Sequence, residues 1–290
     1  MMELSYYLVQ LLNGIQFGFL LFLVASGLTL LFGVMGIINL AHGSFYMIGA
    51  YLVYWLTGLT GNFWFAVLLG LPLALLLGYL VERLAIAFLY QRDHLYQVLL
   101  TFALILIFNE LQRILWGSDV HSVPIPALFD GSISLTENQQ YPIYRLFMSG
   151  ACVAIAAAMY WVIQKTRLGM MIRAGSTNRE MVQALGIHVS RLFAIVFSLG
   201  VALAAFAGMV AAPIDSVYPG MGENVLIISF VIVVIGGTGS IKGAFVGAML
   251  IGLADTFGKV LIPEMASMTV YALMAVILLW RPQGLFGKAA

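Results

Sequence analysis

The chain has 290 residues, of which 62% are hydrophobic and only 9% are charged, and its net charge is +1. Because a soluble domain carries about 25% charged residues, this composition excludes an ordinary soluble globular protein. The charge balance gives no reason to expect a nucleic-acid partner, and the single cysteine, Cys152, excludes a disulfide within the chain.

The hydrophobic residues form blocks long enough to cross a bilayer, since about 20 helical residues span its apolar core of about 30 Å. In chain order these blocks are 8–33, 36–57, 63–81, 95–116, 143–164, 192–213, 223–240, 244–262 and 267–281. We therefore predict an all-α polytopic membrane protein with about 8–9 membrane segments, forming a single transmembrane domain over residues 1–290.

Glycines interrupt two of these regions, so some segments are expected to be broken or re-entrant. They are Gly33, Gly36, Gly43 and Gly49 around the second block, and Gly236, Gly237, Gly239 and Gly243 between the seventh and eighth. Non-helical backbone at membrane depth persists only where protein or a water-filled cavity satisfies it. Broken segments of this kind indicate a substrate pathway rather than a lipid-facing wall.

The loops predict the orientation. Residues 165–191 hold five basic residues and one acid, whereas residues 117–142 hold Asp119, Asp130 and Glu137 and no basic residue. The positive-inside rule makes the first loop cytoplasmic and the second external. Nine crossings then place the N-terminus outside and the basic C-terminus, with Arg281 and Lys288, inside; one re-entrant block would reverse the N-terminal side.

Within the cytoplasmic loop, the 173–191 segment is polar and carries signals of a short helix. Thr177 to Glu180 form a predicted capping box, and Gly186 suits a helix C-terminus. An apolar face is expected to combine Met181, Val182, Ala184 and Leu185. So short a helix needs a surface to dock on. That surface is either its own loops and the lipid headgroups, or a cytosolic partner.

Three stretches resemble one family, the LivH-type permeases of ATP-binding-cassette (ABC) importers for branched-chain amino acids. They are TRLGMMIRAGSTNREMVQALGI at 166–187, GVMGIINLAHGSFYMIGAY at 33–51 and GGTGSIKGAFVGA at 236–248. Glu82, Arg83 and the final RPQGLFG fit as well. The resemblance implies a bacterial inner-membrane subunit that pairs with a second permease, expected to be a different chain. It also implies two cytosolic ATPases and an external binding protein.

The resemblance further implies that residues 178–187 insert into a groove on an ATPase. The residues expected to couple the two subunits are Arg173, Ala174, Thr177, Asn178, Glu180, Met181, Ala184, Leu185, Gly186 and Ile187. The chain itself then needs no cofactor, because its partners hydrolyse the ATP. Its own glycine-rich run, residues 236–242, lacks the Gly-Lys-Ser/Thr of a phosphate-binding loop.

The pathway or its gate is expected at the broken segments, with Asn39, His42, Gly43, Gly236, Gly237, Gly239 and Gly243 as candidates. The alternative for the glycines is close helix packing, and for His42 a hydrogen-bonded helix end. His42 has no second ligand at metal-binding spacing, so no metal site is expected.

Two pairs of opposite charge lie on helix faces within the apolar blocks: Glu110 with Arg113, and Asp255 with Lys259. Ionisable residues in membrane segments are often functional, but a partner of opposite sign also suits a structural ion pair. Both interpretations stay open. The external loop 117–142 is interpreted as a platform for the binding protein or, alternatively, as a passive lid.

The sequence shows no nucleophile–base pair and no chain of carboxylates, so an intramembrane enzyme is not expected. The rival hypothesis is a stand-alone secondary transporter or channel, which would have no use for a cytosolic docking helix. We expect ATP-driven alternating access, with leucine, isoleucine or valine as substrate. Urea, short amides and aromatic acids, which relatives of the family carry, remain alternatives.

Overall fold

The computed structural model describes residues 2–90, 92–136 and 139–287. Glu137 and Lys288, two charges used above to predict the orientation, lie outside these residues. The helices are α1 (Met2–Leu30), α2 (His42–Thr60), α3 (Phe63–Leu84), α4 (His94–Trp116), α5 (Ile143–Lys165), α6 (Arg167–Thr177), α7 (Arg179–Ala184), α8 (Val189–Ala211), α9 (Met221–Gly236), α10 (Ile241–Leu261) and α11 (Ala266–Trp280). A π-helical turn, η1 (Leu31–Met35), extends α1, and short 3₁₀ turns cover Ile86–Leu89, Ala127–Phe129 and Pro263–Met265.

Each predicted apolar block becomes a helix, but the predicted count of 8–9 membrane segments is not confirmed. Among the described residues, six helices are long and apolar enough to cross a membrane: α1 with η1, α3, α4, α5, α8 and α10. Of the others, α9 has 16 residues, about 24 Å at 1.5 Å per residue, which is short of an apolar core of about 30 Å. The apolar part of α11 is also too short, at Met268–Trp280.

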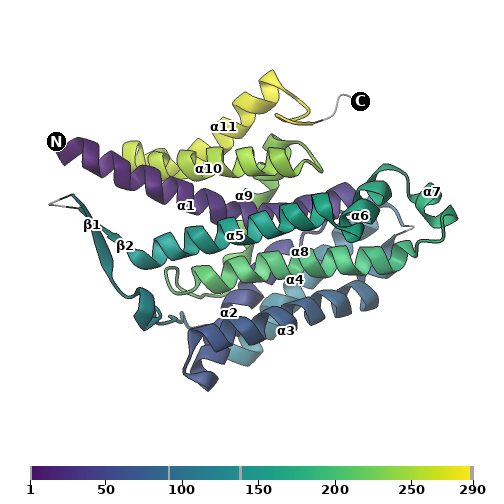
Figure 1. The fold of residues 1–290 in the computed structure, drawn as a ribbon, viewed down its shortest axis with the longest axis horizontal. Coiled ribbons are helices and arrows are strands. Elements are labelled where there is room, and N and C mark those ends of the chain that lie inside the picture. The colour runs from purple at the N-terminus through teal and green to yellow at the C-terminus, as the bar shows by residue number, and fades with distance from the viewer. Residues whose placement is uncertain (1, 91, 137–138, 288–290) are drawn as a thin grey trace.

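The long helices run roughly side by side, so the bundle has two ends (Figure 1). One end carries α6 and α7 and is called the α7 end. The other carries a two-stranded antiparallel sheet, β1 (Ser132–Thr136) and β2 (Gln139–Pro142), and is called the hairpin end. The two loops that were predicted to lie on opposite sides of the membrane are therefore at opposite ends. The N-terminus lies at the hairpin end (Figure 1).

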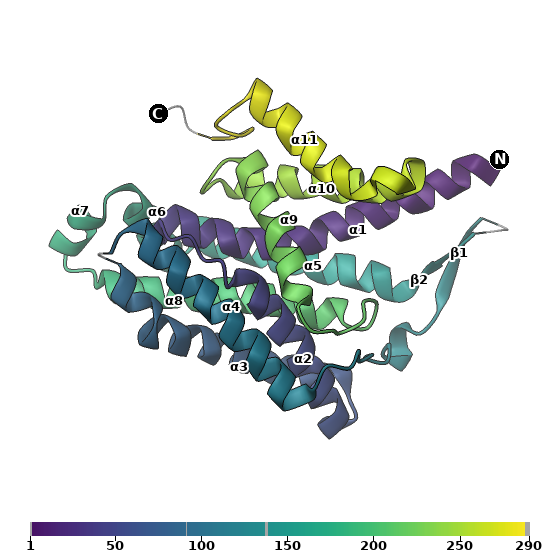
Figure 2. The same cartoon turned by 180° about the vertical axis from the view of Figure 1, so that it is seen from behind.

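The centre of the bundle is built from α1, α2, α8, α9 and α10, and α9 crosses the direction of α1 steeply (Figure 2). Helix α8 contributes more of the buried hydrophobic residues than any other helix, followed by α1 and α2. Helices α2 and α8 approach so closely that a Cβ atom on Gly49 would lie 2.1 Å from the carbonyl oxygen of Ala205. Small residues at such a crossing replace side-chain contacts with backbone contacts, as membrane helix pairs commonly do.

The chain is not helical between η1 and α2, as the glycines of the second block predicted. Gly36 has φ +64° and ends the π-helical turn, and residues 36–39 have no regular structure before α2 begins at His42. A threonine hydroxyl on α4, that of Thr101, lies 3.5 Å from the carbonyl oxygen of Ile38. The non-helical backbone is thus enclosed by protein, which is how such segments are tolerated in membranes.

Candidate functional site

At the α7 end, two short helices follow one another. The helix predicted between Thr177 and Gly186 is present as α7, and α6, which was not predicted, precedes it. Helix α6 begins at a cap on Thr166, whose hydroxyl accepts a hydrogen bond from the Gly169 amide at 3.2 Å. Arg173 on α6 donates a hydrogen bond to the carbonyl oxygen of Ile163 on α5. Arg173 therefore anchors α6 to the end of a long helix, while neighbouring Ala174 is exposed.

The predicted capping box is wrong in its register. Thr177 is the last residue of α6, and its hydroxyl donates to the carbonyl oxygen of Arg173 at 3.0 Å. Asn178 is the true N-cap of α7, because its side-chain oxygen accepts from the Met181 amide at 2.9 Å. Asn is as good an N-cap as Ser or Asp. Glu180 lies in the first turn of α7, where a negative charge favours the helix dipole.

The other end of α7 is closed as the sequence predicted. Gly186 adopts φ +81°, and its amide donates to Gln183 at 2.9 Å while the amide of Ile187 donates to Val182 at 3.2 Å. These two bonds form a Schellman motif, in which the left-handed residue is usually glycine. The short helix is thus fixed at both ends although it has only six residues.

The predicted apolar face of α7 is split between two directions. Val182 is 3% exposed and packs on the chain's own core, whereas Met181 is 58% exposed and Leu185 is 72% exposed. Ala184 is exposed with them. Val182 is therefore the apolar side chain of α7 that packs into the bundle. The remaining apolar side chains form an outward surface, called here the α7 knob (Met181, Ala184 and Leu185).

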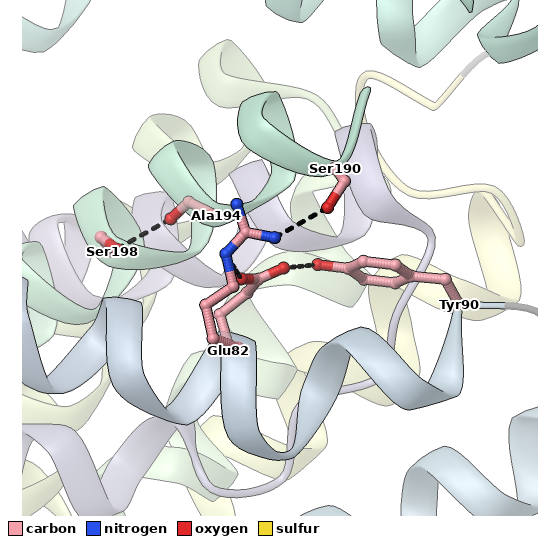
Figure 3. Close-up of polar contacts among 6 residues, drawn as sticks. Glu82, Tyr90, Ser190, Ala194 and Ser198 are labelled. Atoms are coloured by element: carbon pink, nitrogen blue, oxygen red, sulfur yellow. Dashed lines mark hydrogen bonds and ion pairs between the residues drawn. The ribbon is translucent and has the colours of Figure 1, made fainter. Parts of the chain in front are cut away.

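A polar cluster beside the α7 knob joins α3 to the first turn of α8 (Figure 3). The Glu82 side chain is fully buried, and the Tyr90 hydroxyl donates a hydrogen bond to its carboxylate. Arg83 lies 3.6 Å from the same carboxylate and donates to the Ser190 hydroxyl at 2.9 Å. Glu82 and Arg83 were singled out by the family resemblance. No sequence pattern pointed to Tyr90 or Ser190, because only the tertiary structure brings them beside Glu82 and Arg83.

The pathway candidates at the second block are buried in the centre of the bundle. His42 is 0% exposed, and its Nε2 lies 2.9 Å from the carbonyl oxygen of Val24 on α1. A Cβ on Gly43 would overlap the carbonyl oxygen of Gly222 on α9. Within the described residues, the side-chain nitrogens Nδ1 of His42 and Nδ2 of Asn39 have no hydrogen-bond partner. Helix packing therefore accounts for Gly43, and the gate at Asn39 and His42 stays a prediction.

The second glycine-rich region is a tight turn between α9 and α10. Gly236 and Gly243 are in backbone contact across the turn, and a Cβ on Gly239 would lie 3.1 Å from Gly33. Gly237 adopts φ +93° and packs against the C-terminal segment, where the Phe286 amide donates to the Gly236 carbonyl at 3.1 Å. These backbone contacts join distant parts of the chain, so they support close packing as the role of the glycines in this turn. A pore-lining role for these glycines stays a prediction.

Both predicted ion pairs form. Glu110 and Arg113 are 2.8 Å apart on α4, and both side chains are more than half exposed. Asp255 and Lys259 are 2.6 Å apart on α10, where only the lysine is largely exposed. Among the residues that the structure describes, no three histidine, cysteine or acidic side chains are grouped as a metal site would require.

Comparison with known proteins places the chain in a family. The family described as "Branched-chain amino acid transport system / permease component" matches residues 10–278. The chain therefore belongs to this family, and it is a multi-pass membrane protein of mainly helical structure. No solved structure matches it.

Individual relatives cover nearly the whole chain. The high-affinity branched-chain amino acid transport system permease protein BraD of Pseudomonas aeruginosa is 29% identical, over 99% of this chain and 98% of its own length. The permease protein LivH of Escherichia coli is 28% identical, over 99% of this chain and 97% of its own. The high-affinity branched-chain amino acid transport system permease protein LivM of Escherichia coli is 27% identical, over 91% of this chain and 67% of its own length. All three are transport permeases.

Proposed function

We propose that this chain is the membrane-spanning subunit of an ABC importer that carries branched-chain amino acids into the cell. Family membership supports the transport function and the substrate class, because BraD and LivH are permeases for branched-chain amino acids. The α7 knob carries the proposal for the ABC mechanism. An isolated transporter has no evident use for a capped helix that turns Met181 and Leu185 outward.

In this proposal, a cytosolic ATPase receives the α7 knob in a groove and moves it when ATP binds. The α7 knob is held in place, because the Asn178 side chain caps α7 and Val182 packs against the core. Motion of α7 passes directly to α8, which begins at Val189, and through Arg83 and Ser190 to α3. Motion also passes to α5, because Arg173 donates to its last turn. A small displacement is thereby distributed over three long helices.

We further propose a second, different permease as the membrane partner, two ATPases at the α7 end and an external binding protein at the hairpin end. The similarity to both LivH and LivM supports two related permeases in one importer. The α7 end is then cytoplasmic, the membrane is the bacterial inner membrane, and loop 117–142 is the platform for the binding protein. The chain contributes no catalysis and holds no cofactor, since ATP is hydrolysed by its partners.

The proposal is tested by reconstituting the purified permease pair in liposomes, with the ATPases and the binding protein or without them. We expect uptake of labelled leucine only with all components and ATP, and no uptake when a non-hydrolysable ATP analogue replaces ATP. Uptake by the permease alone would identify a stand-alone transporter or channel instead. Uptake of urea or phenylalanine in preference to leucine would keep the ABC mechanism and overturn the substrate class.

A further inference from the structure

At the hairpin end, a hollow opens between α1, α5, α10 and residues 212–220, and it is called here the vestibule. It consists of two cavities of about 320 and 450 Å³. Phe17, Leu20, Asp215 and Lys259 line both cavities, so they adjoin. Small-molecule sites typically measure about 300–1,000 Å³, so the vestibule has the size of a ligand site.

The first cavity gathers four charged side chains from separate parts of the fold. They are Arg145 from α5, Asp215 from the loop after α8, and the Asp255–Lys259 pair on α10. Ionisable residues in a membrane protein are costly in lipid and therefore face the protein interior or water. Two cations and two carboxylates that converge on one cavity indicate a binding site for a ligand with charges of both signs.

Two of these groups have free capacity for a ligand. Arg145 donates to the side-chain oxygen of Asn13 at 2.8 Å, which uses one of the five donors of a guanidinium. In the part of the chain that the structure describes, the Asp215 carboxylate has no hydrogen bond and no ion pair, whereas Asp255 is paired with Lys259. The Asp215 side chain is exposed, so a ligand can reach it. Partial desolvation at the cavity raises the pKa of its carboxyl group, and the positive charges of Arg145 and Lys259 oppose that rise.

The second cavity offers an apolar wall beyond these charges. Its lining includes Leu21 and Val24 from α1 and Met221, Val225 and Ile228 from α9. Asp215 stands where the two cavities meet, because it lines both of them. A ligand with a charged head at Asp215 can therefore extend an aliphatic side chain along the apolar wall.

We propose that the vestibule is the entry site of this subunit for a hydrophobic amino acid in its zwitterionic form. The ligand ammonium group binds the Asp215 carboxylate, the ligand carboxylate binds the Arg145 guanidinium, and its side chain lies against Leu21 and Val24. This inference rests on the proposed function and deepens it. It moves substrate contact from the buried Asn39–His42 region to charged groups on α5 and the 212–220 loop.

The site is tested without the binding protein, which would select the ligand first. Cys152 is the only cysteine and is buried, so it is replaced by serine, and Thr256→Cys introduces a thiol in the lining of the first cavity. The rate of thiol modification by a small charged methanethiosulfonate reagent is measured with and without leucine. Ser134→Cys on the exposed strand β1 is the matched control.

We expect leucine to slow the modification of Thr256→Cys and to leave that of Ser134→Cys unchanged. Leucinamide, which lacks the carboxylate, and 4-methylpentanoate, which lacks the ammonium group, should each protect less than leucine. No protection by leucine up to its solubility would overturn the proposal. A Thr256→Cys thiol that never reacts would overturn it as well, because the vestibule would then be closed to water.

Charge variants separate this inference from the proposed function. Asp215→Asn or Arg145→Gln should abolish the protection and lower uptake at low leucine concentration by about tenfold or more, as expected for a lost hydrogen bond between charged groups. Glu264→Gln, which removes another exposed carboxylate near the hairpin end of α10, should change neither result. If the wild-type importer takes up leucine but the vestibule variants behave like wild type, only the inference fails. If the complete wild-type importer takes up no leucine, the proposed function fails.

Discussion

Gly49 and Gly58 lie on the same helix, α2, and the same substitution to alanine should shift stability in opposite directions. A Cβ on Gly49 would lie 2.1 Å from the Ala205 carbonyl oxygen, about 1.3 Å closer than the 3.4 Å of ordinary contact. The obstacle is backbone, so α2 and α8 must separate. At Gly58, no atom of the described chain outside the neighbouring backbone of α2 lies within 4 Å of the added carbon.

Forcing extra carbon into a packed interface typically costs about 1–3 kcal/mol, and more when backbone must move. Replacing glycine by alanine within a helix stabilises the helix by about 1 kcal/mol. Because backbone must move at Gly49, the cost there is about 3 kcal/mol or more, so Gly49→Ala should lower the free energy of unfolding by about 2 kcal/mol or more, and Gly58→Ala should raise it by up to about 1 kcal/mol. At about 2–4 °C per kcal/mol for 150–250 residues, Gly49→Ala loses about 4–8 °C or more in Tm and Gly58→Ala gains up to about 4 °C.

The assay is thermal unfolding of each purified variant in the same detergent, followed by intrinsic fluorescence. We expect a fall in Tm for Gly49→Ala and no fall for Gly58→Ala. If Gly49→Ala unfolds at or above the wild-type temperature, the backbone contact between α2 and α8 is not the constraint described here. Equal losses for both variants would instead mean that glycine is needed along α2 for its flexibility.

Three further predictions concern single polar contacts. Asn178→Ala removes the N-cap of α7 and should cost about 1 kcal/mol of local helix stability, seen as about fivefold weaker retention of the ATPases with unchanged Tm. Tyr90→Phe leaves the fully buried Glu82 carboxylate without its hydroxyl donor, so it should lower the free energy of unfolding by about 1–3 kcal/mol. Ser190→Ala, at the exposed edge of the cluster, should lower the free energy of unfolding by less. Chemical denaturation of both variants measures the difference. Glu110→Gln breaks an ion pair whose members are both more than half exposed, so it should change stability by less than about 1 kcal/mol, and a larger loss in the same titration would contradict that assignment.

Much of the fold could be predicted because the apolar blocks and their terminal signals are local. The block 63–81 becomes α3 at Phe63–Leu84, and the block 143–164 becomes α5 at Ile143–Lys165. Asn62 caps α3 through its side-chain oxygen, which accepts from the Trp64 amide at 2.8 Å. The count of spans was less predictable, because hydropathy does not show that α2 begins inside the protein or that α9 is short.

The sites were predictable only where sequence neighbours form them. The 173–191 segment was identified correctly as helical, but α6 continues through Thr177, so the cap moved by one residue to Asn178. The packing of Val182 against the core decides which apolar residues of α7 face outward. This packing depends on the tertiary structure, so the local sequence does not predict it. The vestibule gave no sequence signal, since Arg145, Asp215 and Lys259 come from distant parts of the chain.

If the α7 knob couples this chain to cytosolic ATPases, the tagged permease should retain the ATPases in detergent through this surface. The variant Met181→Asp with Leu185→Asp is compared with wild type and with Leu128→Asp plus Ile133→Asp, which adds the same charges to exposed residues at the hairpin end. Burial of each large apolar side chain in a groove is worth about 1.5–3 kcal/mol, so the α7 variant should lose 100-fold or more in affinity, by about 1.4 kcal/mol per factor of ten. We expect the wild type and the hairpin-end control to retain the ATPases, whereas the α7 variant should have the same Tm but retain none. Equal retention by the α7 variant, or no retention by wild type, would contradict it.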